Sequence, residues 1–145
     1  MPDPFHLQRF LDAQAPVWDD ALAEVKAGRK RSHWIWFVFP QMRGLGLSPN
    51  SEFYGIGSLD EARAYLAHPV LGSRLAAITE ALLAHEGRSA NAIFGAPDDR
   101  KLRSSMTLFD AASGDGANAY RAVLRRFFDG VPDARTLELL GKRSL

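Results

Sequence analysis

The chain has 145 residues, of which 46% are apolar and 24% charged. Its formal net charge is +1, and it contains no cysteine. These totals fit one globular domain, and the lack of cysteine excludes disulfides, thiolate metal sites and a cysteine nucleophile. A charge so close to zero disfavours a nucleic-acid binder, which usually has a strongly basic domain. The longest apolar run, residues 34–40, is far shorter than the ~20 residues that cross a bilayer, and the opening MPDPFHLQRF has no apolar signal core. We therefore expect no membrane insertion and a cytoplasmic location.

Two helices are predicted at the start of the chain. Asp3 can cap the first, Pro4 suits its first turn, and apolar residues recur at helical spacing as far as residue 14. The second is expected over residues 16–27, because Gly28 can provide the left-handed turn that ends a helix.

The next stretch, RKRSHWIWFVFPQ over residues 29–41, sets three cations directly before the most apolar run of the chain. A short aromatic run suits a buried strand or a buried helix equally well. Because Ser32 is a good N-cap and every other segment favours helix, we predict a helix over residues 32–39 that ends at Pro40. This helix is expected to place its large side chains at the centre of the core, namely Trp34, Trp36, Phe37 and Phe39.

A glycine-rich segment, residues 42–57, predicts a loop with one turn of helix at residues 49–54, and it is the best place for a mobile lid. Beyond it, helix start and stop signals recur, beginning with a capping box of Ser58 and Glu61. They predict helices over residues 58–67, 69–85, 89–94, 97–112, 117–128 and 132–140. No repeat or linker divides the chain, so we expect residues 1–145 to form a single all-α domain of seven to nine helices.

Five stretches carry a family resemblance: DPFHLQRFLDAQ, GRKRSHWIWFVFPQ, SLDEARAYLAHPVLGSRL, IFGAPDDRKLRSSMTLF and TLELL. Over about residues 3–140 the chain resembles the bacterial family of unknown function numbered eighteen-ten. The resemblance implies an all-helical single domain of bacterial origin without an established activity. Some members carry the label calpastatin, but this chain has none of the disordered character of that inhibitor.

The first candidate site lies in the basic stretch. Arg29, Lys30, Arg31 and His33 follow the end of one predicted helix and precede the start of the next, so cations and free backbone N–H groups could converge on one phosphate or carboxylate. Trp34 lies close enough in sequence to stack on a base or ring. An equally plain interpretation is that the cations are solvated, offset the dipole of the preceding helix and cover the aromatic core with their stems.

The second candidate lies on the helix after Pro97, where Lys101 and Ser105 share a face at the margin of an apolar stripe. The serines could bind a ligand, or they could allow close helix packing while bonding to their own backbone. We predict that the two stretches meet in one anion site with these ligand-binding residues: Arg29, Arg31, His33, Trp34, Gln41, Lys101, Ser104 and Ser105.

Other chemistries are weakly supported by the sequence. The four histidines are scattered and form no metal-binding pair, so neither a metal nor another cofactor is expected. A serine nucleophile lacks its usual strand-to-helix turn, and the paired aspartates at 98–99 suit the first turn of a helix.

Two functions of different class follow from the candidate site. The first is a pocket for a phosphorylated or nucleotide-like small molecule. The alternative is a non-enzymatic module that presents a basic, aromatic-edged surface to a protein partner. A concave site favours the pocket, and a flat exposed patch favours the module.

Overall fold

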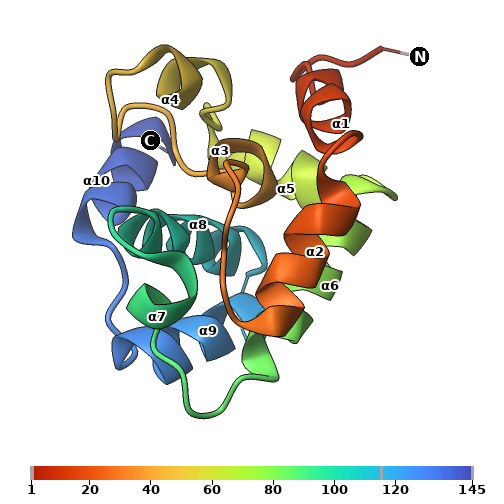
Figure 1. The fold of residues 1–145 in the computed structure, drawn as a ribbon. Helices are drawn as coiled ribbons and strands as arrows, with labels where there is room; N and C mark the ends of the chain where they lie inside the picture. Colours follow the sequence, from red (N-terminus) through yellow and green to blue (C-terminus); the bar gives the residue numbers. More distant parts are fainter. Residues whose placement is uncertain (1, 115, 145) are drawn as a thin grey trace.

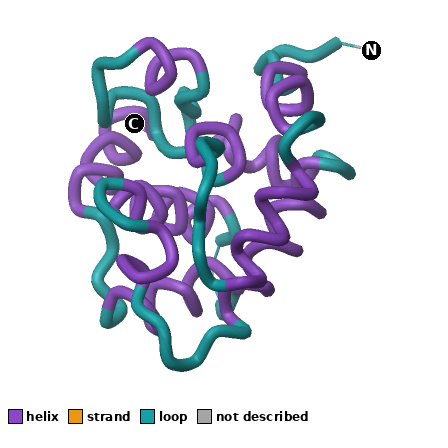
Figure 2. The backbone as a smooth tube through the Cα atoms, viewed as in Figure 1, coloured by secondary structure: helices purple, strands orange, loops and turns teal. Residues whose placement is uncertain are grey.

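The computed structural model describes residues 2–114 and 116–144, and within them the chain forms ten helices, seven of which have seven or more residues. In chain order they are α1 (Gln8–Gln14), α2 (Trp18–Ala27), α3 (Ile35–Val38), α4 (Pro49–Phe53), α5 (Leu59–Ala67), α6 (Leu71–Leu83), α7 (Ala90–Phe94), α8 (Asp98–Ala112), α9 (Ala119–Phe128) and α10 (Ala134–Ser144) (Figure 1). The tube in Figure 2 shows helices joined by loops, and the described residues contain no strand beyond one isolated bridge between Met42 and Ile56. The prediction of a single all-α domain is confirmed.

The fold is arranged around α8. This helix packs against α3, α5, α7, α9 and α10, and α2 runs beside α6 on the right of Figure 1. Its apolar residues Leu102, Met106 and Phe109 are completely buried. Because neighbours cover α8 on several sides, the hydroxyl residues between these apolar positions are buried as well. By contrast, the residues of its first turn, 98–101, are partly buried or exposed.

Most of the predicted start and stop signals are present. The hydroxyls of Ser58 and Ser89 accept hydrogen bonds from the backbone N–H three residues later, as N-caps do. Gly28 ends α2 with a φ of 79°, in the left-handed region that glycine adopts without strain. A Cβ at this position would also lie 3.0 Å from side-chain atoms of Arg88 and His85. Gly28 therefore turns the chain out of α2 and into the basic stretch.

The prediction for residues 32–39 is correct in type but wrong in extent. Only Ile35–Val38 is helical, and Ser32 does not cap it, because the Ser32 hydroxyl donates to the carboxylate of Glu24. Trp34 and Phe39 are buried as predicted, whereas Trp36 and Phe37 are only partly buried. The core at this point is therefore centred on Trp34, whose ring contacts those of Phe39 and Phe94.

A buried arginine fixes the loop that follows. The Arg9 guanidinium donates to the carbonyls of Phe5, His6, Phe53 and Gly55 and to the Glu61 carboxylate, 2.7 Å away. These bonds use the donor capacity of the buried cation, which would otherwise be costly to bury. They tie α1 and α5 to the segment that the sequence predicts as a lid.

None of the helices in the described ranges has the length and apolarity that a membrane span requires.

Candidate functional site

The basic stretch leaves α2 at Gly28 and crosses to the start of α8. The backbone N–H of Arg29 donates to the carbonyl of Glu24, and that of Lys30 donates to the carbonyl of Ile93 in α7. Lys30 turns its side chain inward, with 5% of it exposed, while Arg29 and Arg31 are exposed on either side. The three cations line a hollow of about 500 Å³ that is open to solvent. Residues 29–31 belong to neither a helix nor a strand, and they lie between Gly28 and α3.

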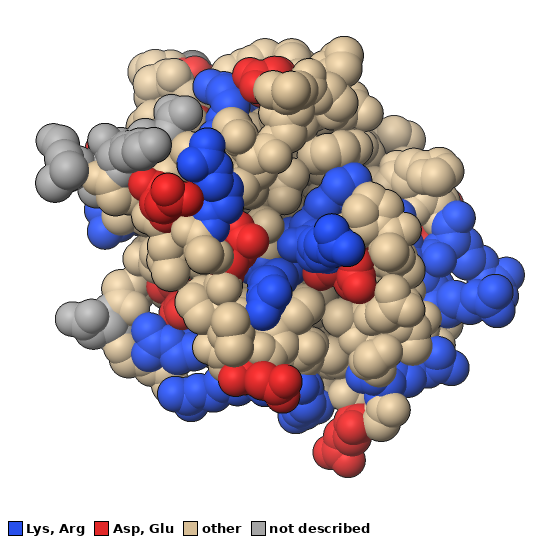
Figure 3. All heavy atoms as spheres, turned by 90° about the vertical axis from the view of Figure 1, so that its left-hand side faces the viewer, with Lys and Arg blue, Asp and Glu red and all other residues tan. Residues whose placement is uncertain are grey.

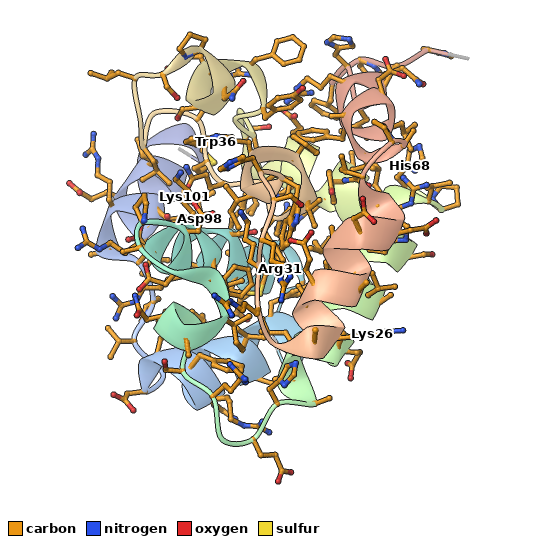
Figure 4. The ribbon with its side chains drawn as sticks, viewed as in Figure 1. Lys26, Arg31, Trp36, His68, Asp98 and Lys101 are labelled. Atoms are coloured by element: carbon orange, nitrogen blue, oxygen red, sulfur yellow. The ribbon has the colours of Figure 1, made fainter. Side chains whose placement is uncertain are left out.

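Two lysines share one carboxylate at this place. Lys30 Nζ lies 2.8 Å from Asp98 Oδ2, and Lys101 Nζ lies 3.3 Å from Asp98 Oδ1. Figure 4 shows Asp98 and Lys101 beside Trp36 at the start of α8, with Arg31 on the loop in front of the molecule. Each ammonium group also lies over an indole ring, Lys30 at 4.9 Å from Trp34 and Lys101 at 4.0 Å from Trp36. The cluster therefore joins the two stretches that the sequence predicts to meet.

The charges in this cluster do not balance. Two cations face one anion, and the side chains of Lys30, Asp98 and Lys101 are at most 22% exposed. The neighbouring Asp99 turns to Asn91 and to the backbone N–H of Arg100. A partly desolvated positive charge is unfavourable unless an anion compensates it. Among the described residues, the Lys101 ammonium makes a single hydrogen bond, to Asp98, so further N–H donors remain for a ligand.

Glu24 of α2 holds the other side of the loop. Its carboxylate accepts hydrogen bonds from the backbone N–H groups of Arg31 and Ser32, the Ser32 hydroxyl and the Trp34 indole N–H, at 2.6–3.0 Å. Desolvation on its own would raise the pKa of Glu24, but these bonds, led by that from the Ser32 hydroxyl, outweigh it and lower the pKa to about 2. The expectation of free backbone N–H groups before α3 is therefore wrong at Arg31 and Ser32, because Glu24 accepts both.

Three of the predicted ligand-binding residues are buried in ways that limit access to a ligand. Trp34 is 1% exposed, and its indole N–H is bonded to Glu24. Ser105 is fully buried, and its hydroxyl has no hydrogen-bond partner among the described residues. Ser104 is buried and donates to the carbonyl of Arg100 one turn earlier. The Ser104 bond is the backbone bond that the plainer sequence interpretation describes.

The other predicted residues divide between the surface and the core. Arg29, Arg31 and His33 are exposed, Lys101 is partly exposed, and Gln41 is buried with its backbone carbonyl accepting the N–H of Ile56. The structure brings Lys101 to the basic stretch through Asp98. The hollow is lined by Arg29, Lys30 and Arg31, and its lining includes neither Lys101 nor His33, Gln41 or the two serines.

Glu24, Lys30 and Asp98 are absent from the predicted ligand-binding residues, although Lys30 belongs to the basic stretch that the sequence singles out. Asp98 lies one turn before Lys101 on the same helix, a spacing that favours an ion pair and could have indicated it. Lys30 points inward where its arginine neighbours point outward, and its backbone N–H bonds to Ile93, a tertiary contact that is not visible in the sequence. In the part of the chain that the structure describes, no three histidine, aspartate or glutamate side chains gather closely enough to hold a metal ion.

The surface around the site carries both signs of charge. Figure 3 shows the face at the left of Figure 1, where lysine and arginine side chains gather near the centre with acidic side chains directly against them. Such a mixed surface lacks the continuous basic stripe that recognises a nucleic-acid backbone.

Comparison with known proteins places the chain in a family. No curated protein matches it. Among solved structures it is similar to the conserved hypothetical protein Rv1873 from Mycobacterium tuberculosis, with 53% sequence identity, a TM-score of 0.93, and coverage of 96% of this chain and 99% of the other. Residues 4–140 match the family model described as protein of unknown function (DUF1810), which is the family that the sequence resembles. The chain therefore belongs to the DUF1810 family.

Proposed function

We propose that residues 29–31 and the start of α8 form one binding site for the phosphate group of a small molecule. The observation that carries the proposal is the cluster of Lys30, Asp98 and Lys101, in which two cations share one carboxylate between the two stretches. A bound phosphate would compensate the remaining positive charge. Arg29 and Arg31 would add guanidinium donors from the rim of the hollow, where neither side chain has a partner among the described residues.

The contacts assign a different role to each cation. Lys30 is enclosed and already bonded to Asp98 and to the carbonyl of Ser32. It would therefore hold Asp98 and the loop in place without contacting the ligand. Lys101 is more exposed and retains free donors, so it would touch the ligand. His33 is exposed two residues beyond Arg31 and could contribute a further donor. Ser104, Ser105 and Gln41 would act only through the packing of α8 and the following loop.

The same contacts favour a ligand that is recognised by its phosphate. A nucleotide base would need an open aromatic face, but Trp34 is buried and Lys101 already lies over the ring of Trp36. The phosphate would therefore supply the binding energy, and a sugar phosphate or a diphosphate fits better than a ligand recognised by its base. Of the phosphorylated and nucleotide-like molecules expected from the sequence, we therefore favour those that are recognised by their phosphate group.

A thermal-shift and calorimetric titration tests the proposal, with inorganic phosphate, pyrophosphate, ribose 5-phosphate and AMP as probes at low ionic strength. A ligand at ~100 times its Kd stabilises the folded state by about 2.7 kcal/mol, which raises the Tm of a chain of this size by roughly 7 °C. AMP and ribose 5-phosphate should bind equally well. Adenosine, which has no phosphate, should not bind.

Matched variants locate the site. Lys101→Ala and Arg31→Ala should each weaken pyrophosphate binding by roughly 10- to 100-fold, since a charge-assisted hydrogen bond contributes about 1.5–3 kcal/mol. Lys26→Ala and Arg125→Ala remove equivalent exposed cations from α2 and α9 and should bind as the wild type does. Wild-type protein that binds none of the phosphates would refute the pocket. The alternative, a module that binds a protein partner, would then take precedence. It would use the exposed arginines for binding, because Trp34 is buried.

A further inference from the structure

We infer that Glu24 is the positioning residue of this site, which holds the arginine-bearing loop in the shape that binds the phosphate. The inference rests on the proposed function and adds to it a residue from a different helix. Glu24 touches no ligand in this account. It acts through Arg31, whose backbone it fixes.

One carboxylate organises three residues of the loop. Glu24 Oε1 accepts the N–H groups of Arg31 at 2.7 Å and Ser32 at 2.9 Å and the indole N–H of Trp34 at 3.0 Å, and Oε2 accepts the Ser32 hydroxyl at 2.6 Å. Most acidic residues in a last helical turn are unfavourable, because the C-terminal end of the helix dipole is negative. Glu24 lies one turn before the end of α2, and the four donors of the loop offset that disadvantage.

The opposite side of the loop is fixed independently. The Lys30 N–H donates to the Ile93 carbonyl at 2.7 Å, and the Lys30 ammonium donates to the Ser32 carbonyl at 2.6 Å. The loop is therefore held between α2 and the α7–α8 region, while the Arg29 and Arg31 side chains stay exposed. A loop ordered before binding loses less conformational entropy when the ligand arrives, so its arginines bind more tightly.

The direction in which one substitution changes the affinity for an anion distinguishes a positioning role from a purely electrostatic one. Glu24→Gln removes a negative charge near the cations, and Coulomb attraction alone predicts that an anion would then bind more tightly. Loss of positioning predicts weaker binding, because an amide cannot accept all four bonds with the strength of a carboxylate. Glu86→Gln is the matched control, since Glu86 is exposed in the loop after α6.

The experiment uses the full chain and inorganic pyrophosphate, with calorimetry for the Kd and NMR hydrogen exchange of the Trp34 indole N–H as a readout that needs no ligand. We expect Glu24→Gln to weaken pyrophosphate binding about tenfold and to speed indole exchange at least tenfold, whereas Glu86→Gln changes neither. Lys101→Ala should weaken binding without changing the exchange rate.

The outcomes separate the two proposals. Equal or tighter pyrophosphate binding by Glu24→Gln overturns the positioning role and leaves the phosphate site intact. Failure of the wild type to bind overturns the phosphate site, and the inference falls with it. If Glu24→Gln does not fold, Ser32→Ala removes one of the four donors in a milder way. It should weaken binding about threefold, and unchanged binding by that variant would overturn the inference.

Discussion

Replacing Lys30 by methionine should destabilise the fold more than the same replacement of Lys101, although both lysines bind Asp98. Lys30→Met removes an ammonium group from a side chain that is 5% exposed, and it leaves the Ser32 carbonyl without that donor. Breaking a buried ion pair usually costs about 3–5 kcal/mol, and the remaining bond from Lys101 to Asp98 reduces this to roughly 2 kcal/mol. For Lys101→Met the pair is longer and more exposed, so the cost is about 0.5–1 kcal/mol.

Urea unfolding of the wild type and both variants measures this difference, with methionine keeping most of the apolar stem in each case. In thermal unfolding of the same proteins, the expected loss of Tm is roughly 6 °C for Lys30→Met and about 2–3 °C for Lys101→Met. A Lys101→Met variant as unstable as Lys30→Met would refute the division of the cluster into a supporting lysine and a ligand-binding lysine.

Further predictions concern the residues around the site. Trp34→Ala should cost about 3–5 kcal/mol in the free energy of unfolding and the partly buried Trp36→Ala less than half of that; chemical denaturation showing equal losses would contradict the burial of Trp34. Arg9→Met should cost about 3 kcal/mol or more by the same assay, because it leaves the buried Glu61 carboxylate unpaired, and a loss below ~1 kcal/mol would count against this anchor. Because the pKa of Glu24 falls from its ordinary 4.5 to about 2 on folding, its stabilising effect is complete above pH 4.5 and is lost as the pH falls towards 2. The stability difference between wild type and Glu24→Gln should therefore shrink over that range, and a difference independent of pH would contradict the bonds to Glu24.

The helical architecture could be predicted because its signals are local. Ser58 and Ser89 cap their helices and Gly28 ends α2 through contacts within a few residues of the chain. Ser32 has the same local signal, but its hydroxyl and its own backbone N–H both donate to the carboxylate of Glu24, eight residues earlier. The error at α3 thus comes from a contact between segments, which propensity does not contain.

The candidate site could be predicted only in part, for a similar reason. The composition of the basic stretch and the position of Lys101 favour a shared location, and Asp98 joins them in the structure. The direction of each side chain depends on tertiary contacts. The bond from the Lys30 N–H to Ile93 accompanies an inward lysine and outward arginines, and the packing of α8 buries Ser105. Sequence therefore indicates which stretches meet, and the packing decides which of their residues can reach a ligand.

The most direct test of the shared phosphate site is a structure of the protein with pyrophosphate bound. We expect one phosphoryl group to lie within about 3 Å of Lys101 Nζ and of a guanidinium nitrogen from Arg29 or Arg31, as charge-assisted hydrogen bonds require. The loop bonds to Glu24 should be retained in that complex. Pyrophosphate bound elsewhere on the molecule, or held by only one of the two stretches, would contradict the claim that they form one site.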